Sequence, residues 1–355
     1  MNPGGTETWL AQVARRLDPA RFELNFLVHA PGIYDEALRE AGAVIVRSAG
    51  PHNPFAYAMS FATLVRRHGP YDVVHSHLHH FSGFVLALAR RAGVSRRLAH
   101  SHSSDAGPAR IGWRAGYLRL GRHWIRRHAT MGFAVSERAA RALFGGGWRD
   151  DPRWKLQPCG IDLAPFRSLP GRAEVRASLG LPPDAKIIGH VGRFVAVKNH
   201  AFLLDVAAEI LRREPRSLFV FAGDGPLRPQ IEAKARSLAL PCRFLGNRPD
   251  VPAFLGACDL FVFPSKQEGL GLAVVEAQAA GLRCLASSSV PGEAIAVPGL
   301  VDRLPLDLAV PAWAEAAISA LQHPEFDRDA ALSAIARSPL AIESSVRALE
   351  EVYGC

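Results

Sequence analysis

The sequence predicts an α/β protein of two domains, each with a parallel β-sheet covered by helices. Three observations support this fold class. The chain has 355 residues, short apolar runs alternate with helix-period segments along its whole length, and a Pro- and Gly-rich stretch at Pro158–Pro170 separates two such series. Apolar residues make up 48% and charged residues 21% of the chain, which excludes a disordered protein.

The apolar runs define the expected strands in chain order. In the first half these are Phe22–His29, Ala43–Arg47, Asp72–His77, Arg97–His102, Gly132–Ser136 and Trp154–Pro158. In the second half they are Lys186–Arg193, Ser217–Gly223, Cys242–Gly246, Leu260–Pro264 and Arg283–Ser287. Amphipathic helices are expected at His200–Arg213, Leu227–Leu238, Gly271–Ala280 and Ile342–Tyr353. We therefore expect domains at residues 1–162 and 163–340, a hinge in Pro158–Pro170, and a helix within 341–355 that crosses back to the first domain.

One strand is missing from this series. A glycine turn that leads into a helix normally follows the first strand of a nucleotide-binding domain. Here Gly4 and Gly5 come almost directly after Met1, and a helical pattern follows them. We therefore expect the first strand of the N-terminal domain to be absent, as a late start or a truncation would produce.

The net charge of +9 is concentrated in the first half of the chain. Residues 1–165 carry +10, whereas residues 166–355 carry −1. This predicts either an anionic partner for the first domain or a solvated basic face. The five cysteines are widely spaced and form no CxxC pair, which favours a reducing compartment. Without a signal peptide or a long apolar run, the expected location is the cytoplasm.

Motifs in the second half predict a nucleotide site. In 259–280 a buried strand leads through a glycine-rich loop into a helix, and backbone N–H groups at such a turn can approach a phosphate. Glu268 and Glu276 in this segment are suited to accept hydrogen bonds from hydroxyls. Arg193 and Lys198 follow another strand and are suited to a diphosphate. The alternative interpretation is that all four are ordinary exposed charges.

Together the motifs GRxxxxK, GDGPLR, FLGNRPDV and E-x7-E, with GGTET, DVVHSHLHHFSGF, AHSHSS, FAVSE and PCGIDL, resemble the family 4 glycosyltransferases of the GT-B fold. The resemblance is strongest to the EpsF-like branch of exopolysaccharide and capsule biosynthesis and covers nearly the whole chain. It implies two Rossmann-like domains with a cleft between them. It also implies a retaining, metal-independent enzyme that moves a sugar from a UDP-sugar to a saccharide or lipid-linked acceptor at the cell surface. No cofactor is expected, because the nucleotide sugar is a substrate.

The resemblance assigns a role to each motif residue. The catalytic residues would be His102, Arg193, Lys198 and Glu268. The donor-binding residues would be Gly4, Gly5, Asp224, Gly225, Arg248, Gly269, Leu270, Gly271, Leu272 and Glu276. In these roles Arg193 and Lys198 neutralise the departing diphosphate, Glu268 contacts the transferred sugar and Glu276 holds the ribose.

Histidines gather after two neighbouring strands of the first half. They are His75, His77, His79, His80, His100 and His102. Strand alternation would align His75, His77 and His79, an arrangement that could bind zinc. Because no carboxylate or cysteine completes the set in the sequence, we expect structural histidines and no metal.

The arginine-dense stretch Arg110–Arg127 has helical spacing, with apolar Ile111, Tyr117, Leu118, Leu120 and Ile125 interleaved. This pattern predicts a basic amphipathic helix that binds the anionic inner face of the cell membrane.

Three other function classes fit the sequence less well. A sugar-nucleotide epimerase of the same architecture would not need the E-x7-E and GRxxxxK motifs. A dehydrogenase would need a G-x-G-x-x-G turn after a strand, and the sequence has none. A nucleic-acid-binding protein is indicated only by the charge, without any recognised binding motif.

Overall fold

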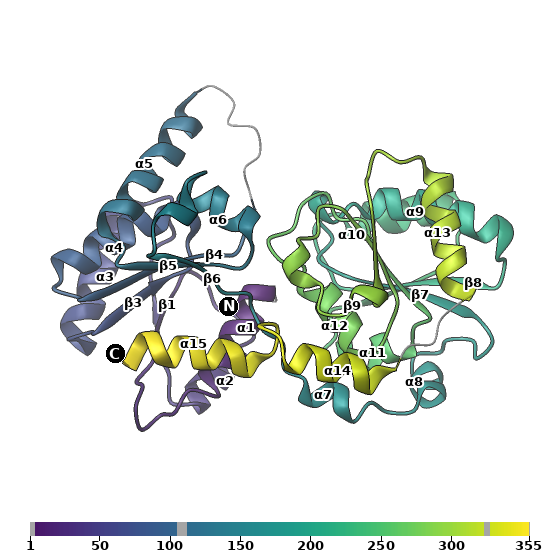
Figure 1. Cartoon of the computed structure of the whole chain (residues 1–355), viewed down its shortest axis with the longest axis horizontal. Helices are drawn as coiled ribbons and strands as arrows, with labels where there is room; N and C mark the ends of the chain where they lie inside the picture. Colours follow the sequence, from purple (N-terminus) through teal and green to yellow (C-terminus); the bar gives the residue numbers. More distant parts are fainter. Residues whose placement is uncertain (1–3, 105–111, 323–326, 355) are drawn as a thin grey trace. The chain divides into compact units, whose positions relative to one another are not determined.

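The structure, a computed structural model, describes residues 4–104, 112–322 and 327–354 (Figure 1). It divides into two compact units. Unit 1 comprises Met1–Gly160 and Ile342–Cys355, and unit 2 comprises Ile161–Ala341. The sequence placed the boundaries after residues 162 and 340. Every strand pair within the named sheets of both units is parallel, which confirms the α/β class.

Unit 1 contains two parallel sheets. β1 (Asn25–Val28) pairs with β2 (Val44–Arg47). A four-stranded sheet has the order β3-β4-β5-β6, with strands at Val73–Ser76, Arg96–Ser101, Met131–Ala134 and Trp154–Leu156. The helices are α1 (Gly5–Ala14), α2 (Asp35–Glu40), α3 (Pro54–His68), α4 (Ser82–Arg91), α5 (Trp113–His128), α6 (Glu137–Phe144) and α15 (Ile342–Gly354).

Local sequence explains where several of these helices begin. At α3 the side chain of Asn53 accepts a hydrogen bond from the backbone N–H of Ala56, and Pro54 occupies the first helical position. At α6 the Ser136 side chain caps the helix by accepting from the Ala139 N–H. The C-terminal α15 packs against α1, and its Ser345 hydroxyl accepts from the Gly160 N–H at 3.0 Å. The last helix therefore completes unit 1.

Unit 2 contains one six-stranded parallel sheet with the order β12-β11-β10-β7-β8-β9. Its strands are β7 (Lys186–Val191), β8 (Ser217–Ala222), β9 (Cys242–Gly246), β10 (Leu260–Phe263), β11 (Cys284–Ser287) and β12 (Val301–Leu304). Its helices are α7 (Ala164–Arg167), α8 (Arg172–Ser178), α9 (His200–Arg213), α10 (Arg228–Ser237), α11 (Val251–Ala257), α12 (Leu272–Ala279), α13 (Val310–Gln322) and α14 (Arg328–Ala336). This is the strand order of a doubly wound nucleotide-binding fold, and its connectivity reverses between β7 and β10.

The core of unit 2 lies between this sheet and the helices on its faces. α9 and α13 pack together over one face (Figure 1). Leu204, Phe219 and Trp313 are fully buried in this core. Among the described residues, no helix combines the length and the apolarity that a bilayer span requires.

A buried charge network also holds unit 2 together. Asp259, just before β10, is 8% exposed, and its Oδ2 lies 2.7 Å from Arg176 Nη2 and 2.6 Å from the Ile187 nitrogen. Arg172 reaches the other carboxylate oxygen. Arg176 is itself buried and donates to the carbonyls of Ala257 and Pro183. The network ties α8 to the start of β7 and β10.

We expect Asp259→Asn to lower the free energy of unfolding by about 3–5 kcal/mol, because the change leaves the buried Arg176 guanidinium without its counter-charge. Urea denaturation measures this loss. Asp205→Asn, which removes a partly exposed ion pair with Lys234, is the control, with an expected loss below about 1 kcal/mol. Equal losses in the two variants would contradict the assignment.

Candidate functional site

Three loops meet at the carboxyl edge of the unit 2 sheet. They are the β7 loop (192–199), the β8 turn (223–226) and the β10 loop (264–271). The β7 and β10 loops follow the two strands between which the connectivity reverses. Open α/β sheets bind their ligands at this point.

Two glycines let the β8 turn pack directly on the β7 loop. Gly223 has φ +132°, and a Cβ there would lie 2.2 Å from the Gly192 oxygen. Gly225 has φ +158°, and a Cβ would lie 2.7 Å from the Phe194 oxygen. The Phe194 N–H donates to the backbone carbonyl oxygen of Asp224 at 3.0 Å, and the Leu227 N–H donates to the backbone carbonyl oxygen of Phe194 at 3.0 Å. Any side chain at these glycines would push the two loops apart.

The β10 loop is attached to the β7 loop in the same way. The backbone N–H of Lys266 donates to the Val197 oxygen at 2.7 Å, and the Ser265 hydroxyl donates to the same oxygen at 3.0 Å. The hydroxyls of Ser287 and Ser289 both donate to the Ser265 oxygen. The three loops therefore form one connected surface.

Lys198 and Glu268 lie at the centre of this surface. Lys198 Nζ is 2.7 Å from Glu268 Oε1, and it lies 4.7 Å from the centroid of the Phe263 ring. The two side chains are only 20% and 9% exposed. Partial burial strengthens the attraction between these charges, and the ring face adds a cation–π contact. Arg193, from the same loop as Lys198, is exposed.

The β10 loop ends at the N-terminus of α12. Gly271 takes a left-handed conformation with φ +92°, and no side chain caps the helix. A helix N-terminus without a side-chain cap is suited to bind an anion through its backbone N–H groups. Gly269 and Leu272 flank this turn, while the Leu270 side chain is buried, so that only its backbone can contact a ligand.

Glu276 lies one turn into α12. The residue is only partly exposed, and burial of its carboxyl group raises the pKa to about 7. Burial favours the neutral acid, since it removes water from the charged form. The group therefore changes its charge near neutral pH.

Two further predicted residues make local contacts. Asp224 is exposed, and its carboxylate accepts from the Gly225 N–H at 2.7 Å. Arg248, after β9, pairs with Asp250 at 2.6 Å, and this guanidinium lowers the pKa of the Asp250 carboxyl. Arg248 thus lies at the same sheet edge, and Asp250 partly neutralises its charge.

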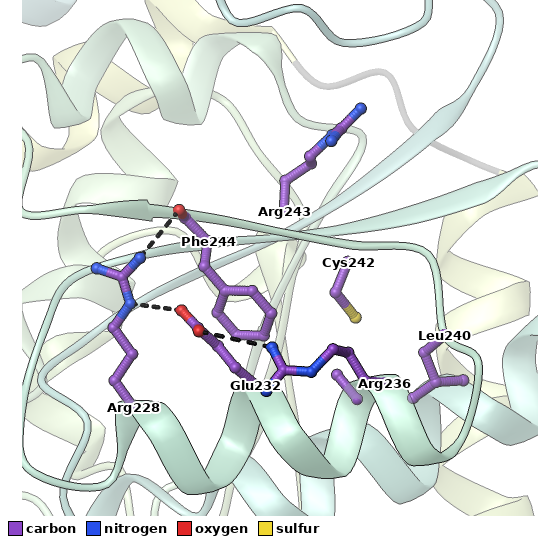
Figure 2. A pocket seen from close by; sticks show the side chains of 8 residues that line it. Arg228, Glu232, Arg236, Leu240, Cys242, Arg243 and Phe244 are labelled. Atoms are coloured by element: carbon purple, nitrogen blue, oxygen red, sulfur yellow. Dashed lines mark hydrogen bonds and ion pairs between the residues drawn. The ribbon is translucent and has the colours of Figure 1, made fainter.

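A hollow of about 350 Å³ lies between α10 and β9 (Figure 2). Glu232 pairs with Arg228 at 2.7 Å and with Arg236 at 3.9 Å, so most of the polar lining is matched internally. Figure 2 shows Arg243 pointing away from the helix. Arg228 also lies 3.8 Å from Asp224, and it thereby supports the β8 turn.

In unit 1 the two groups of histidines meet at the carboxyl ends of β3 and β4. The histidine cluster consists of His75, His77, His100 and His102, whose neighbouring rings lie 4.0–5.4 Å apart. His79 departs from the expected alignment, because β3 ends at Ser76 and His79 begins a short 3-10 helix with φ +51°. Trp9 of α1 packs edge-on against His100. The helix that begins at Gly5, with Gly4 as its N-cap, is therefore anchored to the cluster.

Both ring nitrogens of His102 have neighbours. Its Nε2 is 2.8 Å from His77 Nδ1, and its Nδ1 is 3.5 Å from the Cys159 sulfur. Burial and the nearby rings hold the pKa of His102 well below its usual value, and burial lowers that of His77 to about 4. The cluster is therefore neutral at physiological pH.

Three residues of these two sites were not predicted from the sequence. Phe263 lies under Lys198, Cys159 touches His102, and the hydroxyl of Tyr353 lies 2.6 Å from His75 Nδ1. Cys159 stands in the PCGIDL motif, which could have indicated it. Phe263 and Tyr353 look like ordinary apolar residues of a strand and a helix.

α5 carries the basic face only in part as expected. Arg110 and Ile111 lie outside the described residues. Tyr117 and Leu120 are 43% and 53% exposed, but Ile125 is fully buried. Ile125, one of the apolar residues interleaved with the arginines, is therefore not part of a membrane-facing surface, because this side of α5 packs against α4.

Comparisons with known proteins agree with this geometry. Residues 3–165 match the family described as Glycosyltransferase Family 4, and residues 171–334 match Glycosyl transferases group 1. The chain is 36% identical to EpsF of Bacillus subtilis (strain 168), named as a glycosyltransferase, over 99% of this chain and 94% of that protein.

Solved structures show the same fold. HepE from Anabaena in complex with UDP has a TM-score of 0.80 at 20% identity, covering 99% of this chain and 97% of that one. Sucrose-phosphate synthase from Thermosynechococcus elongatus has a TM-score of 0.81 at 21% identity, covering 99% and 93%. Two Rossmann-like units of the GT-B type and the identity to EpsF lead to one conclusion: the chain belongs to the family 4 glycosyltransferases.

Proposed function

We propose that this chain transfers a sugar from a UDP-sugar to a saccharide or lipid-linked acceptor, with retention of the anomeric configuration. The observation that carries the proposal is the Lys198–Glu268 pair beside the uncapped N-terminus of α12. Two structures of one neighbour, HepE, support the choice of donor, since one contains UDP and the other UDP-glucose. The resemblance of the sequence motifs to the EpsF-like branch of exopolysaccharide and capsule biosynthesis supports a role in cell-surface polysaccharide synthesis.

The proposed chemistry needs stabilisation of a leaving group. As the bond to the sugar breaks, negative charge grows on the diphosphate. Lys198, Arg193 and the first N–H groups of α12 would stabilise that charge, so we propose that no metal or other cofactor takes part. The departing phosphate would accept the proton of the acceptor hydroxyl on the same face of the sugar. Glu268 would then hold sugar hydroxyls rather than act as a nucleophile.

A panel of nucleotide sugars tests the proposal, with nucleotide release and donor-induced thermal shift as the two readouts. We expect one UDP-sugar to stabilise the protein and to release UDP in an acceptor-dependent manner, with EDTA present. An epimerised nucleotide sugar as the product, or a response to none of the donors, would contradict it.

Lys198→Met should reduce turnover by about a hundredfold or more, because a cation that opposes the leaving-group charge is lost. Nucleotide release under saturating donor measures the effect. Lys266→Met is the matched control, since Lys266 is exposed on the adjoining β10 loop, and its turnover should stay near that of the wild type. Near-normal turnover of Lys198→Met would refute the assignment.

Donor affinity should rise about tenfold between about pH 6 and about pH 8. The Glu276 carboxyl has a pKa of about 7, and only its ionised form accepts hydrogen bonds from both ribose hydroxyls. Raising the pH through 7 increases the fraction of Glu276 that is ionised. Calorimetric titration of a UDP-sugar measures the change, since its diphosphate does not titrate in this range. Glu276→Gln should bind more weakly at high pH and lose the pH dependence; an unchanged profile would argue against this role for Glu276.

We further propose that the enzyme works in the cytoplasm, on the inner face of the membrane, through α5. Its described part carries no acidic residue but has several arginines, and Tyr117 and Leu120 lie exposed on it. Basic and apolar side chains on one helix favour an anionic lipid surface.

Liposome flotation tests whether α5 binds an anionic membrane surface. The wild type should float with vesicles containing anionic lipid and less with neutral ones, and salt should weaken binding. Leu120→Ser should reduce flotation, whereas Leu238→Ser, at an exposed apolar position of unit 2, should not. Equal binding to both kinds of vesicle would overturn the proposal.

A further inference from the structure

A buried histidine lies beside the β7 loop in unit 2. His190, in β7, is 1% exposed, and its ring stacks with the Phe263 ring at 5.5 Å. Its Nδ1 lies 2.8 Å from the backbone carbonyl oxygen of Val262 in β10. Because a carbonyl oxygen only accepts, Nδ1 carries a proton and donates it. The histidine therefore ties together the two strands between which the connectivity reverses.

The bond to Val262 also fixes what the other ring nitrogen of His190 can do. In a neutral imidazole with its proton on Nδ1, the Nε2 atom is an acceptor. Burial lowers the pKa of His190 to about 4, so the ring is neutral at physiological pH. Nε2 is buried, and none of the described residues donates a hydrogen bond to it. A buried acceptor without a donor is costly, so a donor that reaches Nε2 would be stabilising.

The side chain of Lys198 passes close to this acceptor. A Cβ at Gly192 would lie 3.1 Å from His190 Nε2 and 3.6 Å from both Cγ and Cδ of Lys198. The imidazole and the lysine chain therefore border the same glycine, and both also contact the Phe263 ring. The ammonium group has three hydrogens, and the bond to Glu268 uses one of them. Lys198 is thus a donor with hydrogens to spare beside an acceptor that lacks one.

A second buried histidine does not supply the donor. His200, the first residue of α9, is 2% exposed, and its ring meets that of His190 edge-on at 4.7 Å. Neither of its ring nitrogens has a hydrogen-bond partner among the described residues, so it makes no bond to His190. Its ring stacks on Phe194 at 4.1 Å instead. His200 therefore contributes packing, and Lys198 is the cation that lies next to Nε2.

We propose that His190 is a positioning residue for Lys198, whose ammonium donates a hydrogen bond to Nε2 when the donor diphosphate draws it away from Glu268. This inference rests on the proposed function, in which Glu268 turns to the sugar hydroxyls. The ammonium would then be held between a phosphate oxygen and the imidazole. A neutral acceptor suits this position, because a second carboxylate would weaken the attraction between Lys198 and the leaving group.

Nitrogen-15 NMR of the full chain, labelled on its histidines, observes the Nε2 atom directly. In the free wild type we expect His190 to have a protonated Nδ1 and an unprotonated Nε2. Saturating UDP should shift the Nε2 signal in the direction of hydrogen-bond formation, and Lys198→Met should abolish that shift. A proton on Nε2 of the free protein would overturn the proposal.

The same titration distinguishes the inference from the proposed function. If UDP binds by calorimetry but leaves the Nε2 signal of His190 unmoved, the inference is wrong and the proposed function stands. If UDP does not bind, the proposed function fails and the inference fails with it.

Three substitutions at His190 separate the roles of its atoms. Glutamine places an amide oxygen near the position of Nε2, asparagine places an amide N–H near that of Nδ1, and phenylalanine keeps only the ring. With the donor that the nucleotide-sugar panel identifies, His190→Asn and His190→Phe should lower kcat about tenfold to a hundredfold with little change in the donor KM. His190→Gln should retain most of the wild-type turnover.

His200→Phe is the matched control, because it replaces the neighbouring buried histidine and keeps the stacking on Phe194, and its turnover should stay near that of the wild type. Urea denaturation confirms that each variant is folded under the assay conditions. Rescue by asparagine rather than glutamine would assign His190 to the Val262 bond alone. Equal turnover in all three His190 variants would leave it a packing role. Either result, or an equal loss in His200→Phe, would overturn the proposal.

Discussion

The candidate donor site depends on the contact between Lys198 and Glu268. The pair joins the β7 loop to the β10 loop, and it is supported from below by the Phe263 ring. It can form only because the loops approach closely: glycines at 223 and 225 admit the β7 loop, and the Val197 oxygen receives two hydrogen bonds from the β10 loop. The Glu268 carboxylate is the counter-charge of the lysine. In the proposed function, the donor diphosphate takes over that role and leaves Glu268 to the sugar hydroxyls.

The two units contribute different chemistry. Unit 2 brings cations, an uncapped helix N-terminus and a carboxyl group that titrates near pH 7 to one sheet edge. Unit 1 gathers neutral imidazoles under Trp9, and it carries most of the excess positive charge of the chain. The excess positive charge that indicates an anionic partner thus lies mainly in unit 1. The residues proposed to hold the donor diphosphate lie mainly in unit 2, whose part of the sequence is nearly neutral.

Much of the fold was predictable, because fully buried parallel strands appear as short apolar runs between helices. All eleven predicted strands exist, and β7, β8 and β9 lie within a residue or two of their expected ends. β12 escaped prediction because Asp302 and Arg303 are exposed on this edge strand and interrupt its apolar pattern. At the site, motif spacing brought Lys198 and Glu268 to the correct sheet edge. It could not show that they touch each other, or that Cys159 lies against His102, since such contacts depend on loop packing and on distant segments.

The most direct test of this account is the affinity of UDP, which lacks the sugar, for the wild type and for Glu268→Gln. The proposed function makes Glu268 a competitor of the diphosphate for Lys198, so removing its charge should strengthen UDP binding several-fold while sugar transfer falls. Calorimetric titration measures both affinities, and Glu232→Gln, at the separate hollow beside α10, serves as the control. Unchanged or weaker UDP binding by Glu268→Gln would contradict the account.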